Sequence, residues 1–322
     1  MCCNLLYMQF GPFTPKAGRL AVLALCEEAR TAPKPGLVDP FHTGAHMDMD
    51  YTLLLRSARC LEQYFQACFR VGSDFSGDDP AEIFTSLRLL GREAEKKMFA
   101  VTAGVNTHKG AIFSLGLLAA AAGLIYYSKF PEKFRKTNSD PAETICLLAG
   151  KICAGIVERD LLCRTAASVS HDCAALTAGE MLFQKMGVTG IRGEAENGFP
   201  VLRTRILPIL RGPWNTEVHQ AEDTIFGKIP VCARLDALLS SMTCLEDSCL
   251  LARGGSGGLD AVRTGAYDVL MSGGAGTPAG RQKLIELDRF CCENKLSPGG
   301  SADMLSSGLF LVYFSSMTSV AL

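Results

Sequence analysis

The chain has 322 residues, of which 48% are hydrophobic and 20% are charged, and its 32 Lys and Arg nearly balance its 33 Asp and Glu. This composition is typical of a globular protein with a large core. It excludes the broad basic surface that nucleic acid or an acidic membrane requires, so we expect neither partner. The 14 cysteines are spread along a chain without a secretory signal, and the pairs Cys2-Cys3 and Cys291-Cys292 lack the CxxC spacing of a zinc site. We therefore expect free thiols in a cytoplasmic protein.

The first 19 residues are mildly apolar but have no basic segment and no small-residue cleavage site, so they are predicted to form an N-terminal arm. From residue 20 onward apolar residues recur at helical spacing, and no convincing strand pattern occurs. One such set is Leu54, Ala58, Leu61 and Phe65. Glycine and proline clusters predict loops, among them 33–44, 187–200, 254–258 and 297–300. The sequence thus predicts an all-α fold, in which residues 20–322 form a single compact helical bundle with long glycine-rich functional loops.

A polar loop precedes the helix that is predicted to begin near Tyr51. It carries Lys34 and Asp39 in KPGLVD, followed by His46 and Asp48 in GAHMD. Two carboxylates this close can hold Mg²⁺ or divide into acid and base. The alternative is that Asp48 or Asp50 caps the helix predicted to begin next.

The segment GVNTHKG packs an amide, a hydroxyl, an imidazole and an ammonium between glycines and leads straight into an apolar run at 111–127. Asn106, His108 and Lys109, with the free N–H groups of a helix start, are suited to hold an anion such as a phosphate. The alternative is that Asn106 or Thr107 merely caps a core helix. The apolar run is predicted to be a buried helix and not a membrane span, because the polar turn abuts it and it is rich in Ala and Gly.

Two later segments place acids beside cations. In GIRGEA, Arg192 is suited to bidentate phosphate contact and Glu194 to metal or base work, with a surface ion pair as the alternative. Glu246 and Asp247 lead to Arg253 at a glycine-rich turn.

The segment SPGGSAD combines hydroxyls with exposed backbone amides at a predicted helix start. Ser297, Gly299, Gly300 and Ser301 are suited to cup a phosphate there. The apolar tail from Leu305 is predicted to be a terminal core helix, with a homodimer interface as the alternative.

Five segments occur in this order: KPGLVD, GAHMDMD, GVNTHKGAIFSLGLL, GIRGEAENGFP and SPGGSADML. Together they closely resemble the triphosphoribosyl-dephospho-coenzyme A synthases, which serve citrate lyase or malonate decarboxylase. The resemblance runs from about Leu20 to the C-terminus. It implies an all-helical cytoplasmic enzyme that joins ATP and 3′-dephospho-CoA and releases adenine. The product is then the precursor of an acyl-carrier prosthetic group, passed on to a holo-acyl-carrier-protein synthase.

The chain departs from the family pattern in one loop. Ser248 and Cys249 stand where the family leads us to expect Thr and Asn after an acid, and Ser256-Gly257 loosens the turn after Arg253. These departures bear on the role of that loop more than on the resemblance to the family.

The implied reaction assigns roles to the candidates. A ribose hydroxyl must displace adenine from C1′ of ATP, which calls for carboxylates, a proton donor and cations. The expected catalytic residues are Asp39, Asp48, His108 and Glu194, with His46 as a second candidate for proton donor or substrate contact. The expected Mg²⁺ ligands are Asp39, Asp48, Glu194, Glu246 and Asp247. The expected substrate contacts are Lys34, His46, Asn106, Lys109, Arg192, Arg253, Ser297, Gly299, Gly300 and Ser301.

Two other functions stay open at this stage. A metal-dependent hydrolase of nucleotides or ADP-ribose also suits scattered acids in a helical fold, and His171-Asp172 fits it weakly. A non-catalytic helical module that binds nucleotides or an acyl carrier is the other. Release of adenine distinguishes the transferase from the hydrolase, and the binding module predicts no turnover.

Overall fold

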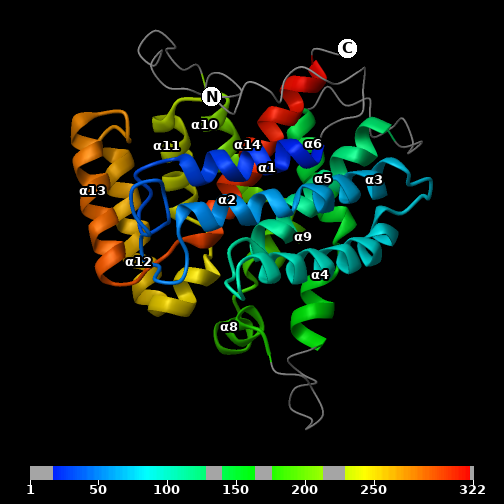
Figure 1. Cartoon of the computed structure of the whole chain (residues 1–322), viewed down its shortest axis with the longest axis horizontal. Coiled ribbons are helices and arrows are strands. Elements are labelled where there is room, and N and C mark those ends of the chain that lie inside the picture. Colours follow the sequence, from blue (N-terminus) through cyan, green and yellow to red (C-terminus); the bar gives the residue numbers. More distant parts are fainter. Residues whose placement is uncertain (1–16, 128–139, 164–175, 213–228, 320–322) are drawn as a thin grey trace.

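The computed structural model describes residues 17–127, 140–163, 176–212 and 229–319. These ranges are helical and contain no strand, which confirms the predicted all-α fold (Figure 1). The helices are α1 Ala17–Arg30, α2 Tyr51–Cys60, α3 Glu62–Ser73, α4 Phe84–Val101, α5 Lys109–Tyr127, α6 Pro141–Ile152, α8 Ala178–Met186, α9 Gly190–Glu196, α10 Leu207–Leu210, α11 Val231–Met242, α12 Ser248–Met271, α13 Pro278–Glu293 and α14 Gly299–Ser319. Helix α1 thus begins inside the predicted arm. The predictions for residues 1–16 and for His171-Asp172 fall outside the described ranges.

The apolar run predicted to be a buried helix is α5, the centre of the core. Its residues are almost all buried, and α3, α4, α6 and α14 pack around it (Figure 1). Glycines bring α3 and α5 into backbone contact: a Cβ at Gly72 would lie 1.9 Å from the carbonyl oxygen of Ala120, and one at Gly123 would lie 2.1 Å from that of Phe69. None of the helices in the described ranges has both the length and the hydropathy of a membrane span.

The apolar tail forms most of α14. Leu305, Leu309 and Phe310 are fully buried, and the ring of Phe314 lies 6.0 Å from that of Phe69 on α3. The tail therefore lines the core of the chain itself, as predicted. The described cysteines are all free thiols, which also agrees with the sequence-based expectation.

Two of the predicted loops are helical, which corrects the prediction. The glycine cluster at 254–258 lies inside α12, where only Gly255 leaves helical geometry, with a φ of 61°. Gly254 and Gly258 serve packing and not a turn, because a Cβ at these positions would lie 2.4 and 2.9 Å from Leu296 Cδ2. In the same way, α9 occupies much of the range 187–200.

Candidate active site

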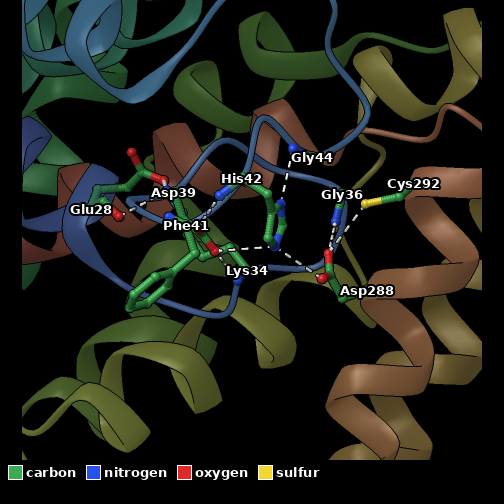
Figure 2. A network of polar contacts seen from close by, with 9 residues as sticks. All are labelled: Glu28, Lys34, Gly36, Asp39, Phe41, His42, Gly44, Asp288 and Cys292. Carbon is green, nitrogen blue, oxygen red and sulfur yellow. Dashed lines mark hydrogen bonds and ion pairs between the residues drawn. The ribbon is translucent and has the colours of Figure 1, made fainter.

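The loop that joins α1 to α2 is organised by the buried carboxylate of Asp39 (Figure 2). Its Oδ1 accepts hydrogen bonds from the N–H groups of Phe41 and His42, at 2.8 and 3.2 Å. Its Oδ2 accepts one from the N–H of Lys34 at 3.3 Å. Because backbone amides engage both oxygens, Asp39 keeps the loop in shape, and a role as base or metal ligand would compete with these bonds.

Lys34 directs its side chain inward, and only 1% of the residue is exposed. Its Nζ donates to the carboxylate of Glu28 and, at 2.8 Å, to the carbonyl oxygen of the same residue. Burial raises the pKa of Glu28, and the neighbouring ammonium opposes that rise. The cation that was predicted to bind phosphate therefore neutralises a buried acid at the end of α1.

The start of α5 places two predicted residues in different roles. Asn106 Oδ1 accepts a hydrogen bond from the N–H of Lys109 at 3.2 Å, so this side chain caps the helix. His108 is buried, and its Nδ1 lies 2.8 Å from Ser57 Oγ. Burial and, to a smaller extent, the charge of Lys34 lower the pKa of His108 to about 4. An imidazole that is neutral at neutral pH is better suited to contact a substrate than to donate a proton.

Side chains from three segments meet at His46. Its Nε2 lies 2.8 Å from Ser297 Oγ, and its Nδ1 lies 3.3 Å from Arg253 Nη2 and 3.4 Å from Asp48 Oδ1. Burial and then the charge of Arg253 lower the pKa of His46, whereas Asp48 raises it. The structure thus brings together four of the predicted residues from three segments that are far apart in the chain.

Asp247 joins the starts of α12 and α14. This carboxylate is 1% exposed, and its Oδ1 accepts from the N–H groups of Cys249 and Leu250 at 2.9 and 3.3 Å. Its Oδ2 accepts from the N–H of Ser301 at 2.9 Å. Burial raises the pKa of Asp247, and hydrogen bonds from these amides and from that of Gly300 lower it. The amides that were expected to hold a phosphate therefore donate to a carboxylate of the protein.

Asp303 lies near enough to Asp247 for the two carboxylates to interact, and together they form a cluster of buried acids. Asp303 was not among the residues predicted from the sequence. It lies against the start of α5, since a Cβ at Gly110 would fall 2.0 Å from Asp303 Oδ2 and the N–H of Ala111 donates to the carboxylate. Burial, followed by the charges of Glu28 and Asp247, raises the pKa of Asp303 well above its ordinary value. The only signal in the sequence is the acid that ends SPGGSAD. The cluster thus combines the starts of α5, α12 and α14 with the end of α1.

Two predicted residues on α9 make other contacts. Arg192 Nε lies 3.8 Å from Asp160 Oδ2, which fits the ion-pair alternative. Glu194 Oε1 accepts from the N–H of Val201 at 2.7 Å, and burial raises its pKa while such bonds lower it. Glu194 therefore supports the chain that follows α9.

Two further predicted residues lie on the surface. Lys109 Nζ is 3.3 Å from Glu95 Oε2, and 44% of the lysine side chain is exposed. Glu246 is exposed immediately before the start of α12. Both positions are open to a charged ligand.

A cleft of about 400 Å³ opens beside His46 and is lined by Thr43, Met47, Asp48, Met49, Asp50, Thr52, Leu53 and Arg56. Asp50 Oδ1 accepts from the N–H of Leu53 at 2.7 Å and so caps α2. The side chain of Asp48, by contrast, is 60% exposed. The structure therefore separates the two acids into a cap and an open carboxylate. Arg56, which was not predicted from the sequence, adds a cation to the same cleft.

In the described residues the chain is an all-helical protein in which Asp247 and Asp303 lie where three helices begin and Asp48 lines a cleft beside His46. The chain matches the CitG family, described as ATP:dephospho-CoA triphosphoribosyl transferase, over residues 14–319. It belongs to this family and is a pentosyltransferase with ATP and dephospho-CoA as substrates. This match confirms the resemblance carried by the five segments. No solved structure matches the chain significantly.

Proposed function

We propose that the enzyme transfers the triphosphoribosyl group of ATP to 3′-dephospho-CoA and releases adenine. The product would be the prosthetic-group precursor of citrate lyase or malonate decarboxylase, passed to a holo-acyl-carrier-protein synthase in the cytoplasm. The observation that carries this proposal is the cleft in which the open carboxylate of Asp48 and the cation of Arg56 lie together. Displacement at C1′ of ATP needs a carboxylate near the sugar and positive charge near the triphosphate, and one cleft offers both.

We assign one residue to accept a proton in this reaction and another to donate one. Asp48 takes the proton of the attacking ribose hydroxyl as its bond to C1′ of ATP forms, while Arg56 binds the triphosphate. Asp303 gives a proton to adenine as the bond between C1′ and the base breaks, since its raised pKa favours the protonated acid. His46 and His108 contact the substrates as neutral imidazoles, because the pKa of each is lowered.

Mg²⁺ is the cofactor that we propose, because it usually combines substrate phosphates with one or two carboxylates. Asp39, Glu194 and Asp247 already accept hydrogen bonds from backbone amides. With Asp48 as the base, the exposed Glu246 is the carboxylate left for the ion. Bound with ATP, Mg²⁺ would neutralise part of the triphosphate charge. We expect Glu246→Gln to raise the Mg²⁺ concentration for half-maximal turnover about 10-fold, and an unchanged Mg²⁺ dependence would contradict this assignment.

The reaction itself is tested by incubating the purified protein with ATP, Mg²⁺ and 3′-dephospho-CoA. Free adenine and the mass of the coenzyme product are followed together. We expect adenine release that requires both substrates and a product heavier by one triphosphoribosyl unit. Adenine or phosphate release without the second substrate would indicate a hydrolase, and nucleotide binding without turnover would indicate a binding module.

The role of Asp48 is tested against a matched neighbour in the same cleft. Asp48→Asn removes the proposed base and should lower kcat/KM by about 100-fold or more. Asp50→Asn is the control, because an Asn side chain also caps a helix and the cleft keeps its shape. If the two variants lose the same activity, Asp48 is not the base.

A further inference from the structure

The side chain of His42 links the loop 34–48 to α13 (Figure 2). Its Nε2 lies 3.1 Å from Asp288 Oδ2 and 3.5 Å from Asp39 Oδ2. On the other side of the ring, Nδ1 accepts a hydrogen bond from the N–H of Gly44 at 3.0 Å. We refer to His42 with these three partners as the His42 bridge. It connects two points of the loop with each other and with a helix that is distant in the sequence.

The Gly44 contact decides which ring nitrogen carries the proton. A backbone N–H can only donate, so Nδ1 must offer a lone pair, and the proton of a neutral ring is then on Nε2. From Nε2 it is donated toward the carboxylates of Asp39 and Asp288. Asp288 Oδ1 accepts in addition from the N–H of Gly36 at 3.0 Å. The loop is therefore held to Asp288 by two separate donors, the Nε2–H of His42 and the N–H of Gly36.

The same residues form a possible metal-binding set, because ligand atoms of His42, Asp288 and Cys292 lie within 4.8 Å of one another. Zinc would need a lone pair on Nε2 and a thiolate. Nε2 instead carries the proton. Burial and the neighbouring Asp288 raise the pKa of Cys292 to about 11, and its Sγ donates to Asp288 at 3.6 Å. The hydrogen bonds therefore favour a structural link over a metal site.

The loop is also closely packed where the bridge holds it. Gly36 has a φ of 66°, and a Cβ there would lie 2.1 Å from the carbonyl oxygen of Leu296. Gly44 has a φ of 59°, and a Cβ there would lie 2.6 Å from the backbone of Leu37. Both positions require glycine, for its left-handed backbone and for the lack of space. The bridge thus acts on a loop that is already pressed against the end of α13.

We propose that His42 and Asp288 are positioning residues of the active site, which hold the loop 34–48 on α13 so that Asp39 shapes it and Asp48 faces the cleft. This role rests on the proposed function. Neither His42 nor Asp288 touches a substrate in this proposal, so their removal acts through geometry. A misplacement of about 1 Å in an active site costs about 100-fold in rate.

Two variants of His42 separate the halves of the bridge. His42→Asn keeps an acceptor near the position of Nδ1 for Gly44 but is too short to reach Asp288. His42→Gln can place an amide N–H near the position of Nε2 and restore that contact. We expect His42→Asn to lower kcat about 10-fold to 100-fold with KM for ATP nearly unchanged, and His42→Gln to recover most of the loss. Amide hydrogen exchange in residues 34–44 should become faster in His42→Asn and return toward the wild-type rate in His42→Gln.

Cys292→Ser is the control that separates positioning from metal binding. A serine hydroxyl can still donate to Asp288, so we expect unchanged turnover and exchange. Zinc content is measured after equilibration with Zn²⁺ and gel filtration. One bound zinc per chain in the wild type that is lost in Cys292→Ser together with activity would overturn the proposal, as would wild-type kcat and exchange in His42→Asn. The exchange measurement does not depend on turnover. If the protein released no adenine, the proposed function would be contradicted, whereas the exchange rates of the His42 variants would still test the bridge.

Discussion

Residue 110 must be a glycine because the side chain of Asp303, which is far away in the chain, lies against it. A Cβ at Gly110 would lie 2.0 Å from Asp303 Oδ2, so Gly110→Ala must displace the carboxylate from the start of α5. Overpacking of this kind costs about 1–3 kcal/mol. We expect this variant to lose that much free energy of unfolding in a denaturant titration, and to lose turnover because Asp303 moves.

Gly91→Ala in α4 is the matched control for this substitution. A Cβ at Gly91 has its nearest neighbour, Tyr64 Oη, at 3.6 Å and therefore fits. Replacing glycine by alanine inside a helix gains about 0.5–1 kcal/mol. If the two variants are equally stable, the carboxylate of Asp303 is not held against Gly110.

His108 makes stability depend on pH in a predictable direction. Its pKa in the folded protein, about 4, lies below the ordinary value of 6.5, so the unfolded chain binds a proton in this window that the folded chain does not. Stability is therefore lost as the pH falls from 6.5 toward 4. His108→Asn removes this group while its amide can still reach Ser57. We expect the free energy of unfolding to fall less steeply with decreasing pH in this variant, and equal slopes would show that His108 is protonated in the folded protein.

At the scale of the elements, Asp247 holds the first turns of two helices with one carboxylate. Asp247→Ala would leave the amides of Cys249 and Leu250 on α12, and that of Ser301 on α14, without their acceptor. Loss of a cap together with buried unpaired donors costs about 2–4 kcal/mol. We expect a loss of this size in denaturant unfolding, and a smaller loss in Asp247→Asn, which retains one acceptor oxygen.

Asp79→Ala provides the comparison for this cap. Asp79 is exposed, and its side chain accepts from the N–H of Ala81, at 3.0 Å, at the start of a short 3₁₀ turn. A single exposed cap of this kind contributes about 0.5–1 kcal/mol. An equal cost for Asp79→Ala and Asp247→Ala would mean that α14 does not depend on Asp247.

The helices differ in how well the sequence predicts them, and the reason is physical. Helix α5 and the apolar part of α14 were predicted because their residues are buried on nearly every side, which leaves a long apolar run in the sequence. The run of glycines in α12 was misread as a turn. Gly254 and Gly258 are there to admit Leu296, and a contact between such distant positions leaves no local pattern.

At the scale of the whole molecule, the site could be predicted in its segments but not in its contacts. The segments around Lys34, Asp48 and Asp247 were identified because polar residues beside glycines are unusual in an apolar chain. Which of these groups face a ligand depends on packing between segments. Asp48 remains open, whereas Lys34 is paired with the carboxylate of Glu28, and Asp247 accepts hydrogen bonds from helix amides. Such pairings arise only when the chain has folded.

The ion pair between Glu27 on α1 and Arg234 on α11 joins distant parts of the same fold. The two side chains are 4% and 3% exposed, and Arg234 Nη1 lies 2.6 Å from Glu27 Oε2. Arg234→Met would leave the buried carboxylate of Glu27 with Arg30, at 3.6 Å, as the remaining cation in ion-pair distance within the described ranges. Removing one partner of a buried pair costs about 3–5 kcal/mol. We expect a loss of this size in the free energy of unfolding.

The double variant Glu27→Met with Arg234→Met tests whether stability needs the ion pair itself or only requires that no unpaired charge is buried. With no charge left in the core, apolar side chains of similar volume can be as stable as the ion pair or more so, so we expect most of the lost stability to return. Lys96→Met is the surface control, because its partner Glu93 is 71% exposed and such pairs contribute about 0–1 kcal/mol. If the double variant is as unstable as Arg234→Met alone, the cost comes from packing between α1 and α11. The pair would then be a consequence of how these helices meet and not a charge that the fold must balance.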